Sequence, residues 1–473
     1  MGKAAGIKGL LKSAVLVGGL AITAMAPQRA AAENIVDAMI GAYNTSGLLE
    51  QQRAVLRAAD ENVAVALASL RPVISWTSQL TRTLAKTQNS GFKINSYETD
   101  YFTGLTLSQL LYDGGASTLS RQAAQEAVLA TRQTLLSVEQ QILFRAASAY
   151  LNVVLYSENV RLQENNVRLL QEELRAAQDR FDVGEVTRTD VALAEAQLAA
   201  AKSSLASARG TLVSAQAEYY NATGHKPGPL AGEPRLPKAA ASQKAATDIA
   251  VRNHPSILSA QHQVKAAELT ADAASRAMGP NVSLSASIGV TEATTNTDYT
   301  HSATVGASMS QPIYQGGALT ANHRQALANR DTYRAALLTA QNDVVQDVAD
   351  AYVRLEVAKA NLVSSAEQVR AAQVAFDGIR EEAKLGARTT LDVLSAEQDL
   401  LDAQTNQISA RSEEGIATYQ LLVAQGLLTA ERLGLAVQIY DPTLYYNLVK
   451  NAPTKVSKRS RDLDRVLKAL GKE

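Results

Sequence analysis

The 473-residue sequence contains no cysteine, and this absence excludes several kinds of chemistry at once. There can be no disulfide framework, no zinc site built on thiolates and no thiol nucleophile. Aromatic residues are also scarce, at 5% of the chain, whereas a large globular core normally uses many of them to fill volume. The 46 basic residues balance the 46 acidic ones, so no basic face for nucleic acid is indicated.

Long apolar runs are missing as well. The stretch Ser13–Ala26 has about 14 residues, short of the roughly 20 needed to span a bilayer as a helix. It follows three lysines and precedes the small residues Ala30–Ala32, which is the pattern of a secretory signal. We therefore predict a cleaved signal peptide at 1–32 rather than a membrane anchor. No cysteine follows that site to carry a lipid, so we expect no lipid anchor. No other apolar run approaches 18 residues, so any membrane span must be built from strands.

The rest of the chain contains two copies of one sequence repeat. Tyr112–Gly115 recurs as Tyr314–Gly317, and Gly184 recurs as Gly386, all at an offset of 202 residues. Upstream the offset changes to 208, so the first copy carries six extra residues between 72 and 108. An insertion confined to one segment predicts a loop there.

Each copy has the same predicted plan, in which proline or glycine separates helical runs rich in alanine, glutamine and leucine. Pro255 falls inside one helical stretch, so its first turns are expected to form a separate short helix. The predicted segments are the first repeat 33–230 (helix about 37–70, β-hairpin about 72–112, long helix 116–182, helix 187–223), a linker 231–244, the second repeat 245–426 (helix about 245–278, β-hairpin about 281–312, long helix 318–384, helix 389–425), and a C-terminal equatorial segment and tail 427–473.

The hairpins carry the pattern of membrane strands. From residue 282 to 291, apolar residues alternate strictly with serine, glycine and threonine. About ten residues of this alternation suit a strand of an outer-membrane barrel, although a soluble sheet packed on one face would show it too. Four strands cannot close a barrel, and open strand edges are not tolerated in lipid. If these strands span a membrane, several chains must share one barrel.

This repeat, together with the tip sequence Gly386–Leu394, resembles the TolC-like outer-membrane efflux protein family over essentially the whole chain after the signal. The resemblance implies a mainly α-helical fold with a small β part. Tandem-repeat long α-helical hairpins would form a periplasmic tunnel, and four β-strands per chain would contribute to a trimeric 12-stranded outer-membrane barrel. The location would be the outer membrane of a Gram-negative bacterium, extending into the periplasm. The ending Gly434–Val437 and Tyr440–Pro442 is similar to that of the family's type I secretion branch.

The resemblance also implies partners and a gate. The expected partners are two further copies of the chain, outer-membrane lipid, a periplasmic adaptor (membrane fusion) protein and an inner-membrane transporter, which supplies the energy for passive exit through the duct. Asp190 and Arg388 match the family's salt-linked gate pair, and Asp392 matches the acidic residue that rings the closed entrance. The alternative for these residues is solvated charge near a helix start, which contributes little.

The tips, where each long helix turns back into a shorter one, resemble the surface that adaptor proteins bind, although a tight turn between helices would need glycine in any case. Two departures from the family pattern, Ala383 and Ser395, predict a gate that is more weakly latched and less selective for cations. The residues expected to contact the adaptor are Val183, Gly184, Leu385 and Gly386.

Neither catalysis nor a cofactor is indicated. The five histidines show no spacing for a metal site, and no nucleophile motif or phosphate-binding loop occurs, so we expect no enzyme, no cofactor and no metal. The favoured function is an outer-membrane duct for type I protein secretion. The alternatives are a multidrug or small-molecule efflux duct of the same fold and, more remotely, a periplasmic coiled-coil structural protein without a pore.

Overall fold

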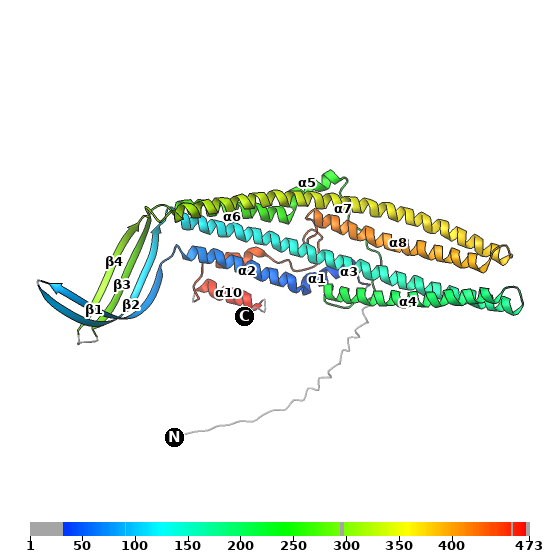
Figure 1. Ribbon diagram of the computed structural model, residues 1–473, viewed down its shortest axis with the longest axis horizontal. Coiled ribbons are helices and arrows are strands. Elements are labelled where there is room, and N and C mark those ends of the chain that lie inside the picture. Colours follow the sequence, from blue (N-terminus) through cyan, green and yellow to red (C-terminus); the bar gives the residue numbers. More distant parts are fainter. Residues whose placement is uncertain (1–31, 90, 294–297, 456, 470–473) are drawn as a thin grey trace, which may run out of the picture.

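The computed structural model describes residues 32–89, 91–293, 298–455 and 457–469. The predicted signal peptide at 1–32 lies almost wholly outside these ranges. The chain is a long body of parallel and antiparallel helices. A β-sheet lies at one end, and two turns that each join a pair of helices lie at the other (Figure 1). Of the helices in the described ranges, none combines the length and the apolar character needed to cross a bilayer.

Two helices of 67 residues run the length of the body: α3 (Ala116–Asp182) and α7 (Ala318–Lys384). Each is about 100 Å long at 1.5 Å per residue. Each turns back at its tip into a shorter helix, α4 (Arg188–Thr223) or α8 (Thr390–Ala424). The bounds of these helices lie within one residue of those expected from the sequence.

The half of each long helix nearer the sheet lies beside another shorter helical stretch, which includes α2 for α3 and α6 for α7. Two shorter stretches therefore lie end to end beside each long helix (Figure 1). The helix expected at 37–70 is in fact divided into α1 (Ile35–Thr45) and α2 (Gly47–Ala68), because the Ser46 hydroxyl accepts a hydrogen bond from Leu49 N and starts a new helix. The break expected at Pro255 is present between α5 (Gln243–Asn253) and α6 (Pro255–Arg276).

Four antiparallel strands form one sheet in the order β1-β2-β3-β4. Their bounds are β1 Val73–Asn89, β2 Phe92–Tyr112, β3 Asn281–Ala293 and β4 Tyr299–Ser310. The six extra residues of the first copy were expected in a loop, and this was wrong. β1 and β2 have 17 and 21 residues, against 13 and 12 for β3 and β4, so the insertion falls in strand rather than in a loop. The pairing of β1 with β2 continues to Asn89 and Phe92, whereas β3 pairs with β2 only as far as Asp100, so the first hairpin extends past its neighbour.

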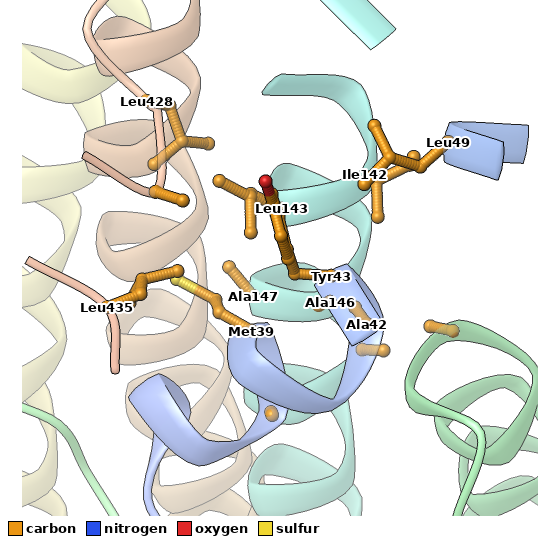
Figure 2. Packing of buried hydrophobic residues seen from close by; sticks show 14 of the residues in the cluster. Met39, Ala42, Tyr43, Leu49, Ile142, Leu143, Ala146, Ala147, Leu428 and Leu435 are labelled. Carbon is orange, nitrogen blue, oxygen red and sulfur yellow. The ribbon is translucent and has the colours of Figure 1, made fainter. Parts of the chain in front are cut away.

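The main hydrophobic core lies half-way along the body, where α1 and α2 pack on α3 (Figure 2). Met39 and Tyr43 meet Leu143 there, and each such side chain contributes roughly 1.5–3 kcal/mol by leaving water. The C-terminal segment closes this core with Leu428 and Leu435 before it forms α9 (Pro442–Val449) and α10 (Lys458–Ala469).

Candidate gate at the helix tips

The turns that join α3 to α4 and α7 to α8 are built alike. Gly184 and Gly386 have φ of 83° and 78°, a left-handed conformation that side chains with a Cβ rarely adopt. In each turn a backbone N–H closes a six-residue ring: Glu185 N donates to Arg180 O and Ala387 N donates to Glu382 O, both at 2.9 Å. Glycine is therefore required here by the backbone itself.

The next residues in each turn form a capping box. Thr187 donates to Asp190 Oδ2 through its N–H (2.9 Å) and its hydroxyl (2.7 Å), and Asp190 N donates back to Thr187 Oγ1 at 3.4 Å. Thr389 and Asp392 repeat this arrangement with distances of 3.0, 2.9 and 3.2 Å. Hydrogen bonds from the threonine hydroxyl and backbone N–H hold the pKa of both aspartates below the usual range, so both remain ionised.

Arg388 takes a partner that sequence reasoning did not identify. Its Nε lies 2.8 Å from Glu382 Oε2 in the same turn, and this bond raises the pKa of the guanidinium. Within the described residues of this single chain, Arg388 forms no ion pair with Asp190. The two do line one hollow between the hairpins, with a volume of about 620 Å³, so the structure brings them to the same place without joining them.

The two helical hairpins, α3–α4 and α7–α8, meet along a seam just above the tips. The seam is the contact of α8 with α3 and α4, together with the adjoining part of α7. Arg380 on α7 lies 3.6 Å from Glu173 on α3, and Gln197 Nε2 on α4 donates to Gln398 Oε1 on α8 at 3.3 Å. Leu394 of α8 adds apolar contact with residues of α3 and α4, namely Val167, Leu170, Leu198 and Ala201. Sequence reasoning missed these links, because the polar residues that make them do not recur between the repeats.

The tip side chains themselves face solvent. Val183 is 71% exposed and Leu385 is 86% exposed, so each tip presents an apolar side chain to water. Ala383 is partly buried beside Phe376, and Ser395 is exposed. Among the described residues, no group of three or more His, Asp or Glu side chains is placed to hold a metal ion.

The family model described as "outer membrane efflux protein" matches residues 42–225 and 235–427, which is most of the chain. The chain belongs to the outer membrane efflux protein family. A relative, the outer membrane efflux protein BepC of Brucella suis, is 35% identical over 449 residues, covering 94% of this chain and 96% of BepC. This membership places the protein in the outer membrane, extending into the periplasm, in a family of channels rather than enzymes.

Two further comparisons agree with this family. The alkaline protease secretion protein AprF of Pseudomonas aeruginosa is 26% identical over 371 residues, which is 76% of each chain. The crystal structure of the Campylobacter jejuni CmeC outer membrane channel superposes with a TM-score of 0.72 at 17% identity, covering 89% of this chain and 90% of CmeC. The CmeC likeness concerns the fold, which is that of TolC-like channel-tunnels.

Proposed function

We propose that three copies of this chain form one gated duct, through which cargo driven from the inner membrane leaves the cell passively. The observation that carries the proposal is the four-stranded sheet. In the described chain β1 and β4 each have a neighbour on one side only, and a strand edge left open in lipid leaves backbone groups without partners. Pairing β4 of one copy with β1 of the next removes every edge, and three copies supply twelve strands.

Exposed apolar side chains on the sheet support the same assembly. Trp76, Val305 and Met309 are 76%, 79% and 70% exposed, and the alternation of the strands gathers such residues on one face. A face of this kind suits lipid. The opposite face, lined by serine, threonine and glycine, suits a water-filled lumen.

At the other end, Asp190, Arg388 and Asp392 are proposed as gate residues of the assembled duct. Asp190 and Arg388 line one hollow at the tips, and Asp392 lies in the capping box of the turn that carries Arg388. This placement supports the role, because the three pairs of helical hairpins in a trimer would converge there. Three inward Asp392 carboxylates, ionised through their capping hydrogen bonds, would give a constriction that attracts cations. The exposed Val183 and Leu385 beside Gly184 and Gly386 are proposed to contact a periplasmic adaptor, with an inner-membrane transporter completing the pathway.

For the cargo, we favour type I protein secretion, in keeping with the similarity to AprF, a protease secretion protein, over three quarters of both chains. The similarity to BepC, an efflux protein, favours the second candidate, small-molecule efflux. A deletion strain separates them: loss of a secreted protein from the medium with unchanged drug susceptibility supports secretion. Increased susceptibility with normal protein secretion supports efflux.

The assembly can be tested by cross-linking, since the chain has no cysteine to interfere. Leu80→Cys in β1 is combined with single cysteines scanned along β4, and a short thiol cross-linker is added to the membrane-embedded protein. A ladder ending at a covalent trimer is expected for the positions in register. Each single-cysteine variant is the control, and a ladder that continues beyond three chains, or stops at two, would contradict the proposed trimer.

A further inference from the structure

One carboxyl group in the seam between the hairpins is buried without a partner. Glu397 of α8 is only 6% exposed, and within the described residues neither of its side-chain oxygens accepts or donates a hydrogen bond. Buried carboxylates are normally paired or hydrogen-bonded, because an isolated charge is costly to remove from water. The gate role proposed for the residues at the tips does not involve this carboxyl group.

The surroundings of Glu397 contain charges of both signs. The charged residues that share its hollow or act on it electrostatically are Glu158, Arg161, Arg168 and Glu173 on α3, Arg380 on α7 and Arg411 on α8. Arg380 already lies against Glu173, so its charge is shared. Burial first, and then the Glu173 carboxylate, raise the pKa of Glu397 to about 7, against a smaller opposing effect of Arg380.

The position of this group links its protonation to the separation of the hairpins. A neutral carboxyl can stay in the closed seam beside the Leu394 contacts, whereas an ionised one is left there without a donor and beside another carboxylate. If α8 moves away from α3, water reaches Glu397 and the ionised form loses its penalty.

We propose that Glu397 is a positioning residue that makes closure of the periplasmic mouth depend on pH: its neutral form lets the two hairpins pack, and its ionised form drives them apart. This inference rests on the proposed function of a duct gated at the tips. Asp190 and Asp392 do not supply such a response near neutrality, since the pKa of each is lowered by its capping box.

The size of the response follows from the two states of the group. In the closed seam the pKa is about 7, and in a water-exposed open state it returns toward 4.5. Each pH unit between the two values changes the closed-to-open ratio tenfold, so the full effect is about 300-fold. The closed state is favoured below pH 4.5, loses ground as the pH rises to about 7, and changes no further above that.

The test measures the distance between the tips directly. Spin labels are attached to Val183→Cys and Leu385→Cys in the full-length assembled protein, which has no other thiol. Distance distributions are recorded from pH 5 to pH 8 in three backgrounds: otherwise wild type, Glu397→Gln and Asp60→Asn. Asp60 of α2 is the matched control, because it is fully buried, lacks hydrogen-bond partners among the described residues and has its pKa raised to about 7, but lies far from the tips.

The expected result is a distance that increases with pH up to about 7 in the wild-type and Asp60→Asn backgrounds and stays at the short, low-pH value in Glu397→Gln. A pH response in Glu397→Gln equal to that of wild type, or no response in any background, would overturn the inference. If the distances behave as expected but the purified trimer conducts no ions at any pH, the pH-dependent separation of the helical hairpins by Glu397 stands and the proposed duct fails.

Discussion

The variant Leu394→Ala tests whether the seam near the proposed gate can be weakened separately from the rest of the fold. It is 6% exposed and packs from α8 onto Val167, Leu170 and Leu198 of the opposite hairpin. Truncation of such a side chain to alanine typically costs about 2–5 kcal/mol. Because the seam lies near the solvent-exposed tips and can relax, we expect a loss of about 2–3 kcal/mol. At 1.4 kcal/mol per tenfold, this shifts the local equilibrium towards separated hairpins by roughly 30- to 150-fold.

The assay compares Leu394→Ala with Leu143→Ala in a planar bilayer and in thermal unfolding. Leu143 is 0% exposed in the main core (Figure 2), and this core lies where α1 and α2 pack on α3, half-way along the body from the tips (Figure 1). Both variants should lower the unfolding temperature, and only Leu394→Ala should raise the single-channel conductance. The reasoning is refuted if Leu394→Ala is destabilised but conducts like wild type, or if Leu143→Ala opens the channel as much.

Two other perturbations have outcomes set by the structure. Gly386→Ala should destabilise the tip by about 1 kcal/mol, because φ is 78° there, whereas Gly210→Ala in α4, with open space around it, should be neutral or stabilising; denaturant unfolding compares the two. Burial raises the pKa of Asp60 from 3.8 to about 7. Its contribution to the free energy of unfolding should therefore be fully present below about pH 4 and be lost as the pH rises to about 7. Asp60→Asn should flatten that part of the curve of unfolding temperature against pH, and an unchanged curve would contradict the assignment.

Much of the fold was predictable because helix length and strand alternation are properties of local sequence. The 67-residue helices α3 and α7 contain no proline and end at glycine turns, so their bounds follow directly from the residues. The break at Ser46 was not predicted, since a serine cap inside a helical run looks like any exposed polar residue. The longer first hairpin was misjudged because the sequence shows an insertion but not where the strand ends.

The candidate site was less accessible to sequence reasoning. The turn glycines and the aspartates of the capping boxes recur at a fixed spacing, which made them visible. Arg388 pairs with Glu382 because the turn folds residue 388 back beside the end of α7, and that geometry is absent from the sequence. The seam residues Arg380, Glu173 and Glu397 come from three helices, and no periodicity connects them.

The central claim is that the assembled chain is a duct closed at its tips, and single-channel conductance in a planar bilayer tests it most directly. The purified wild-type trimer is compared with Arg388→Ala, which removes the cation of the proposed gate pair and leaves the capping boxes intact. We expect a small wild-type conductance that rises clearly in the variant. A correctly folded trimer that conducts no ions in either form would contradict the account.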